Sequence, residues 1–101
     1  MSQTPIIVNV DRGISDLVPL FLEQRKADQL ALTAAIASED WAAVRHAAHG
    51  MAGAGASYGF DRITELGDAM VEAGRNKDLP SLIRLKAEFD DYMARLVVNF
   101  M

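Results

Sequence analysis

The chain of 101 residues contains no cysteine, which excludes disulfide bonds and thiolate metal sites. Its basic residues are scattered and the formal net charge is -4, which argues against nucleic-acid binding, because phosphate contacts need clustered Lys and Arg. No apolar stretch is long enough to cross a bilayer, and the short run over residues 6–8 lacks the basic flank of a secretory signal. We therefore expect a soluble, cytoplasmic protein with neither a membrane nor a nucleic-acid partner.

What the chain does contain is typical of a globular domain, with 50% hydrophobic and 24% charged residues. A chain of this length normally folds as one domain without a disulfide or a structural metal. We expect a single domain over residues 1–101, with a lead-in over residues 1–14 and a helical bundle over residues 15–101.

The lead-in is expected to be extended over residues 1–10 and to pack on the body through Ile6, Ile7 and Val8. No segment indicates a β-strand. The first long helix is expected from about residue 15 to residue 37, with Pro19 in or just before its first turn, where it can separate a short helix from the long one. The apolar residues of this helix recur at a helical period. They are Leu17, Leu20, Phe21, Ala27, Leu30, Ala31 and Ala34.

The second long helix is expected from Trp41 to about Tyr58. Asp40 precedes it as a natural N-cap, because its carboxylate can accept a hydrogen bond from a free backbone N–H of the first turn. Gly59 follows as a left-handed C-terminal cap.

Two further helices are expected to begin at Asp61 and Asp78, which are predicted to act as their N-caps. The third helix ends near Asn76, and the fourth has Pro80 in its first turn. Each helix carries an apolar stripe. The stripes consist of Ile63, Leu66, Met70 and Ala73 in the third helix and Leu82, Leu85, Phe89, Tyr92 and Leu96 in the fourth. Four amphipathic helices joined by short loops predict an all-α protein, an up-down four-helix bundle.

The second helix differs from the others because residues 47–59 (AAHGMAGAGASYG) are almost all small. Each of Gly50, Gly53 and Gly55 costs up to about 1 kcal/mol relative to alanine inside a helix. Glycine at such positions usually indicates that something must come close to the backbone.

Helical geometry predicts which face of this segment is exposed. At about 100° per residue, His49 points roughly 180° away from Tyr58, near the middle of the outer face. The predicted core stripe is Val44, Ala47, Ala48, Met51, Gly55 and Tyr58. The predicted neighbours of His49 on the outer face are Arg45, His46, Ala52, Gly53 and Ala56. A partner can therefore reach the imidazole from its C-terminal side without meeting large side chains.

The histidines, Ser57 and the glycines also have simpler interpretations. His46 and His49 can be ordinary exposed residues, and a zinc site is disfavoured because it needs three or four ligands and the chain has no other His or Cys. Ser57 lies about 80° round the helix and two turns further on, too far to form a nucleophile–base pair. Close helix packing explains Gly55, which faces inward, but not Gly53, which faces outward.

The segment over residues 40–60 resembles the histidine-containing phosphotransfer (HPt) domain. The motif of that family is an Ala-His pair, then Gly four positions after the His and a second Gly six positions further on. Here these residues are Ala48, His49, Gly53 and Gly59. Residues 17–23 resemble the entry into the first long helix of the family, and residues 63–66 and 70–72 resemble the helix that follows the motif.

Two details of the match concern the site. If the motif is registered on His46 instead, Ala56 falls where the second Gly belongs, so His49 gives the better register. The family usually carries Lys immediately before the first Gly, and here that residue is Ala52. Arg45 or His46 can partly replace the positive charge that a lysine supplies near the phosphoryl oxygens.

The resemblance implies a phosphorelay intermediate without kinase or ATPase activity of its own. A neutral ring nitrogen of His49 would accept a phosphoryl group from an aspartyl phosphate of a receiver domain and pass it to another receiver. Arg45, His46, Ala52, Gly53 and Ala56 would lie at the docking surface near that group. Phosphoryl transfer depends mainly on positioning and charge neutralisation.

The resemblance also bears on cofactors and partners. The chain has no Walker loop and no acidic cluster, so no cofactor or metal is expected on it, and Mg²⁺ is expected on the partner receiver. The implied partners are receiver domains and, in addition, a hybrid histidine kinase, and the chain is expected to be a monomer. The alternative function is a non-phosphorylated helical adaptor that binds a receiver or kinase through the same face.

Overall fold

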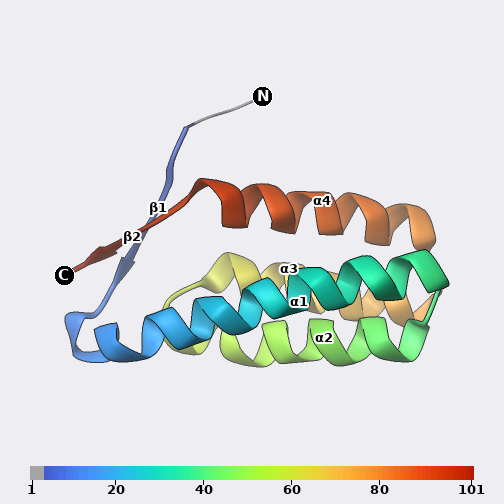
Figure 1. The fold of residues 1–101 in the computed structure, drawn as a ribbon, viewed down its shortest axis with the longest axis horizontal. Helices are drawn as coiled ribbons and strands as arrows, with labels where there is room; N and C mark the ends of the chain where they lie inside the picture. The colour runs from blue at the N-terminus through green and yellow to red at the C-terminus, as the bar shows by residue number, and fades with distance from the viewer. Residues whose placement is uncertain (1–3) are drawn as a thin grey trace.

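A computed structural model, which describes residues 4–101, contains four long helices that lie side by side, with two short strands at one end (Figure 1). The helices are α1 (Val18–Ser38), α2 (Trp41–Ala54), α3 (Asp61–Arg75) and α4 (Leu79–Arg95). Two 3-10 helices, η1 (Arg12–Leu17) and η2 (Ala56–Tyr58), precede α1 and follow α2. The strands are β1 (Ile6–Val10) and β2 (Leu96–Phe100). The predicted helical bundle is confirmed, and a separate short helix does precede Pro19.

The expectation that the chain contains no strand is wrong. β1 and β2 pair in parallel, from Ile6 opposite Leu96 to Val10 opposite Phe100. As a result α4 ends at Arg95 and Leu96 belongs to the strand rather than to the helical stripe. Each strand has only five residues, and the partner of each lies at the other end of the chain, so neither segment carries a strong local signal.

The lead-in packs on the core through every second residue, as a strand must. Ile6 and Val8 are partly buried and Val10 is fully buried, whereas Ile7 is 64% exposed. The prediction that Ile7 packs on the body is therefore wrong. Residues 1–3 of the expected lead-in lie outside the described residues.

The apolar stripe predicted for α1 lies on the wrong face, apart from Phe21. Leu17, Leu20 and Leu30 are 50%, 64% and 76% exposed. Ala27, Ala31 and Ala34 are exposed as well. The buried residues of α1 are Val18, Phe21, Arg25, Leu32 and Ala35. Apolar residues are spread almost evenly around this helix, so their period does not identify the inner face. The helix in fact buries an arginine and exposes leucines.

Two of the three predicted N-caps are confirmed. The carboxylates of Asp40 and Asp78 each accept a hydrogen bond from the backbone N–H three residues later, at 3.1 and 3.2 Å. Asp61 does not cap α3: Phe60 is the N-cap and Asp61 is the first helical residue. There its charge complements the positive end of the helix dipole. α3 ends one residue before Asn76, as expected.

Glycines bring α2 and α3 into close contact. A Cβ on Gly67 would lie 2.5 Å from the backbone N of Ala52 and 2.8 Å from the carbonyl oxygen of Ala48. A Cβ on Gly55 would lie 2.6 Å from the backbone N of Thr64. The two backbones therefore touch, which turns the opposite side of α2 outward.

The predicted stripes of α3 and α4 face the core. Ile63, Leu66, Met70, Ala73, Leu82, Phe89 and Tyr92 are buried, and Leu85 and Leu96 are partly buried. These residues, with the inner face of α2, hold the bundle together.

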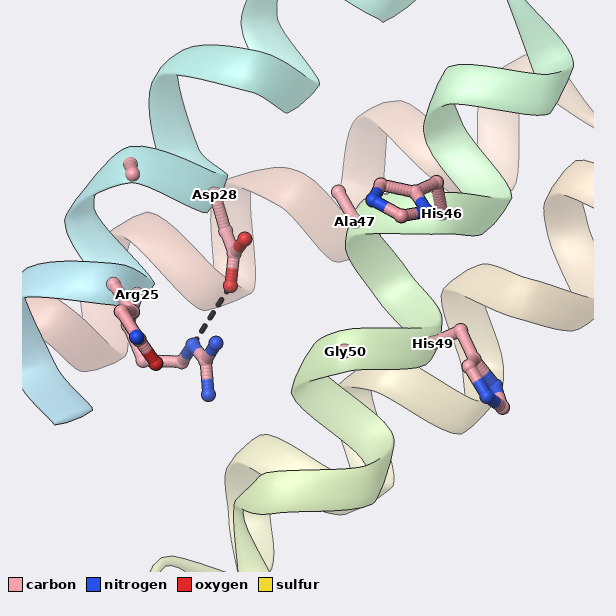
Figure 2. Close-up of a pocket in the computed structure, with 8 residues that line it drawn as sticks. Arg25, Asp28, His46, Ala47, His49 and Gly50 are labelled. Carbon is pink, nitrogen blue, oxygen red and sulfur yellow. Dashed lines mark hydrogen bonds and ion pairs between the residues drawn. The ribbon is translucent and has the colours of Figure 1, made fainter.

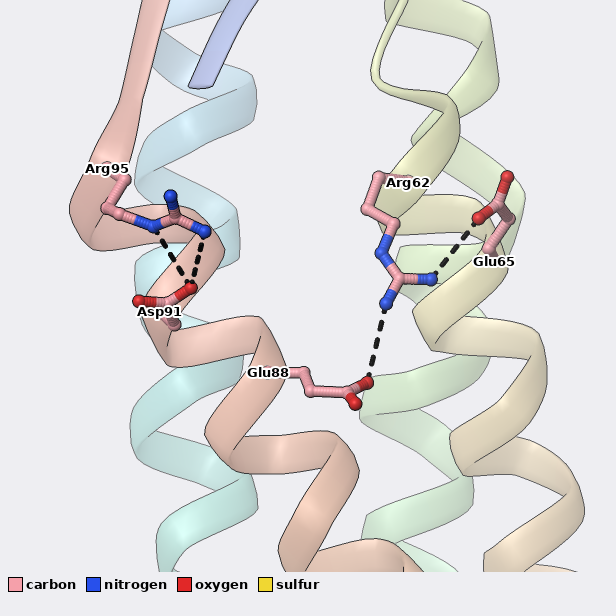
Figure 3. Close-up of polar contacts among 5 residues, drawn as sticks. All are labelled: Arg62, Glu65, Glu88, Asp91 and Arg95. Atoms are coloured by element: carbon pink, nitrogen blue, oxygen red, sulfur yellow. Dashed lines mark hydrogen bonds and ion pairs between the residues drawn. The ribbon is translucent and has the colours of Figure 1, made fainter. Parts of the chain in front are cut away.

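Ion pairs on the outside of α3 and α4 contribute little to the stability of the bundle (Figure 3). Arg62 contacts Glu65 at 3.2 Å and, across to α4, Glu88 at 3.4 Å, while Arg95 contacts Asp91 at 2.9 Å. Exposed pairs of this kind contribute about 0–1 kcal/mol each. The apolar interior, rather than these pairs, determines how α2 is held.

Candidate functional site

The outer face of α2 has the composition that its helical angles predict. His49, Arg45 and His46 are exposed, as are Gly53 and Ala56, and Ala52 is partly buried beside α3. The inner stripe of Val44, Ala47, Ala48, Met51 and Gly55 is buried and Tyr58 is partly buried. The imidazole of His49 therefore stands in solvent on a helix whose opposite face is in the core.

The surface beside His49 is bare. A Cβ added at Gly50 or at Gly53 would meet no heavy atom within 4 Å. Internal packing therefore does not require glycine at these two positions, in contrast to Gly55. The absence of side chains leaves the backbone of α2 accessible along the path to the ring.

The end of α2 differs from the prediction. The helix stops at Ala54 instead of continuing to Tyr58, and the chain turns through η2 before α3 begins. Gly59 does adopt the predicted left-handed conformation, with φ +90°, but it closes η2 rather than α2.

The hydroxyl of Thr64 explains this early end. In a continuous helix the N–H of Ala56 would donate to the carbonyl of Ala52. Here the Oγ1 atom of Thr64 lies between these two groups: it accepts from the N of Ala56 at 2.7 Å and donates to the carbonyl oxygen of Ala52 at 3.0 Å. A side chain from α3 thus opens the α2 ladder just beyond the bare surface.

Thr64→Val is expected to lower the free energy of unfolding by about 2 kcal/mol, because it leaves the backbone groups of Ala52 and Ala56 without these partners. Thr64→Ser keeps the hydroxyl and should lose much less. Urea denaturation followed by circular dichroism measures both. Equal losses in the two variants would mean that the methyl group, not the hydroxyl, matters.

An open groove of about 380 Å³ lies between α1 and α2, next to His49. It is lined by Gln24, Arg25, Ala27 and Asp28 of α1 and by His46, Ala47, His49 and Gly50 of α2. Figure 2 shows Arg25 and Asp28 reaching from α1 toward α2, while the ring of His49 points away from them. The groove therefore joins the exposed histidine to a charged pair on the neighbouring helix.

The pair of Arg25 and Asp28 is unusual because its cation is buried. Arg25 is only 5% exposed, its Nε donates to Oδ2 of Asp28 at 2.7 Å, and its guanidinium carbon lies 4.9 Å from the ring centre of Phe21. Its Nη1 atom is buried without a hydrogen-bond partner in the described structure. Burial raises the pKa of the Asp28 carboxyl above its ordinary value, and the charges of Arg25 and His46 oppose that rise.

Sequence reasoning missed Arg25 and Asp28. The signal that was available is a basic residue within the helical segment that follows Phe21. This signal does not identify Arg25 as buried, because the apolar period of the segment predicts that the leucines form the inner face.

Two exposed leucines, Leu17 at the end of η1 and Leu20 in α1, continue the groove as an apolar surface. Leu20, Gln24 and Ala27 lie on successive turns of one helix face, and Leu17 precedes them by one turn. Gln24 and Ala27 line the groove, so Leu17 and Leu20 extend the same side of the molecule. Residues assigned to the core from their period thus lie beside the candidate site.

Among residues 4–101, no three His, Asp or Glu side chains are grouped so that they could hold a metal ion. In the same part of the chain no helix has the length and apolar character needed to span a membrane.

Comparison with known proteins gives one finding. The family model described as "Hpt domain" matches residues 16–98, which includes all four helices of the bundle. Neither the curated proteins nor the solved structures include a match to the chain.

Proposed function

Because the chain belongs to the Hpt domain family, whose members carry phosphoryl groups on a histidine in two-component phosphorelays, we propose that His49 is the residue that carries it here. The observation that carries this proposal is the exposed ring of His49 beside the bare backbone at Gly53, one turn further along α2. His46 is exposed too, but only His49 is followed by glycines at both motif positions, Gly53 and Gly59.

The proposed chemistry is a reversible exchange between nitrogen and oxygen. A neutral ring nitrogen of His49 attacks the phosphorus of a receiver's aspartyl phosphate. The new N–P bond forms as the O–P bond breaks, and the electron pair of the O–P bond returns to the receiver carboxylate. A second receiver aspartate then takes the group by the reverse step. Mg²⁺ and most of the charge stabilisation would come from the receiver, so this chain would act without kinase or ATPase activity.

The proposed docking face has two parts. The first consists of the outer residues of α2 that surround the ring, namely Arg45, His46, Ala52, Gly53 and Ala56. The second is an apolar surface formed by Leu17 at the end of η1 and Leu20 in the first turn of α1, which are half or more exposed. Apolar side chains next to a small-residue surface suit a partner helix or loop that packs closely.

The test is transfer of radiolabel from a phosphorylated receiver domain to the purified chain. We expect label on the wild type and on His46→Ala, and complete loss of label in His49→Ala. Label that persists in His49→Ala and is lost in His46→Ala would show that the wrong histidine was chosen.

The alternative is an adaptor that binds a receiver without accepting phosphate. Ala52 favours it, because an apolar residue next to Gly53 supplies no charge for a phosphoryl group. Tight binding to a receiver without label from any phosphorylated receiver would support the adaptor and exclude the relay.

A further inference from the structure

Arg25 has a buried N–H donor that makes no hydrogen bond within residues 4–101. A guanidinium carries five N–H donors in a rigid fork, and it stays charged when it is buried. Here Nε is bound by Asp28, while Nη1 is buried with no partner in the described structure. A buried donor without an acceptor costs free energy and calls for a functional explanation. Its position on the groove that also contains His49 indicates what that explanation is.

A phosphoryl group on His49 brings two negative charges to a surface that has few nearby cations. Arg45 is exposed, and its side chain leans toward α3, since its Cγ would be 3.1 Å from a Cβ on Gly74. A solvated arginine on that side interacts weakly. Arg25 lies on the other side of His49, toward α1, where partial exclusion of water strengthens its charge interactions.

The ring of His49 can move toward Arg25. A histidine in a helix adopts either of two χ1 rotamers, and a change between them carries the ring sideways across the helix surface. The ring is exposed, and Gly50, the next residue, lines the groove without a side chain that would stand between the ring and Arg25. In Figure 2 the ring points away from the guanidinium, so contact requires this rotation and an outward swing of Arg25.

We propose that Arg25 binds the phosphoryl oxygens of phosphorylated His49 in the groove between α1 and α2. This inference rests on the proposed function of His49. Arg25 makes and breaks no covalent bond. Its unpaired N–H donor gains a charged acceptor, a phosphoryl oxygen. Asp28 keeps the guanidinium next to the groove through Nε, which makes Asp28 a positioning residue.

The test loads His49 without a receiver, by using phosphoramidate as donor. The P–N bond of the donor breaks, ammonia leaves, and a P–N bond to the ring forms. The ³¹P resonance of the product is assigned by its absence in His49→Ala. The pKa of the attached phosphoryl group is then measured from the shift of this resonance with pH, because a nearby cation lowers that pKa.

Arg25→Met is expected to raise the phosphoryl pKa by about one unit and to slow acceptance from a phosphorylated receiver by about tenfold or more. Lys26→Met is the matched control. It removes a cation from the adjacent residue, whose side chain is 66% exposed, and should change neither quantity. A phosphoryl pKa that is the same in wild type and Arg25→Met would overturn the inference.

Two further results keep the test decisive. If Arg25→Met does not fold, Arg25→Gln is titrated instead: its neutral amide can still donate to Asp28 but carries no charge, so the phosphoryl pKa should again rise, and an unchanged value contradicts the inference. If no receiver transfers label but the phosphoryl pKa still depends on Arg25, the relay fails and the groove assignment stands. If label is transferred through His49 but Arg25→Met changes neither quantity, the relay stands and the groove assignment fails.

Discussion

Gly67→Ala is expected to destabilise the chain by about 3 kcal/mol, because a methyl group there has no space. The added Cβ would lie 2.5 Å from the backbone N of Ala52 and 2.8 Å from the carbonyl oxygen of Ala48, and backbone atoms cannot move aside as a flexible side chain can. Alanine gains about 1 kcal/mol of helix propensity over glycine, which is too little to offset the separation of α2 from α3.

Gly53→Ala is the matched control on the facing helix. It adds the same methyl group where no heavy atom lies within 4 Å, so it should raise the free energy of unfolding by about 0.5–1 kcal/mol. Thermal unfolding measures both variants, and Gly67→Ala should melt roughly 10–25 °C below the wild type. Equal melting temperatures for the two variants would mean that α2 and α3 are not in backbone contact.

Gly53→Phe is expected to reduce phosphoryl transfer from a receiver by about a hundredfold or more while the chain remains folded. The phenyl ring would stand one turn from His49 on the bare surface, and a small displacement of the reacting groups is enough to produce a loss of this size. The labelled-receiver assay measures the effect. Phosphoramidate, being small, should still load His49 in this variant, which separates blocked docking from a damaged nucleophile.

The control places the same bulky residue away from the docking face. Ala87→Phe adds a phenyl ring at an exposed position of α4 and should leave transfer unchanged. Normal transfer in Gly53→Phe would show that the receiver does not approach His49 across Gly53, and the docking face would have to lie on the α1 side.

These two glycines have opposite roles on the two sides of α2. Gly67 permits contact between α2 and α3, and through it sets the rotation of α2 about its own axis. That rotation exposes His49 and leaves Gly53 in solvent. The tight inner contact and the bare outer surface are thus parts of one arrangement.

The sequence by itself determined the features that depend on neighbours within one or two helical turns. The caps at Asp40 and Asp78 and the inner and outer faces of α2 follow from side-chain type and helical period, which are local. The exposure of His49 belongs to this group. The inner stripe of α2 is strongly apolar and must be buried, so the opposite face of the helix, which carries His49, must face solvent.

Only the tertiary structure decided the features that depend on residues distant in the chain. β1 and β2 pair across almost the full length of the sequence, and Thr64 ends α2 from another helix. The buried face of α1 was decided by the helices against which it packs. That face includes Arg25, which contacts Asp28 and Phe21 of its own helix, and it leaves Leu20 exposed. Because a helix with apolar residues on all sides can be buried on any of them, its partners, and not its own period, select the face. This selection places the buried arginine on the groove that His49 also lines, and it leaves Leu20 exposed one turn before Gln24 of that groove.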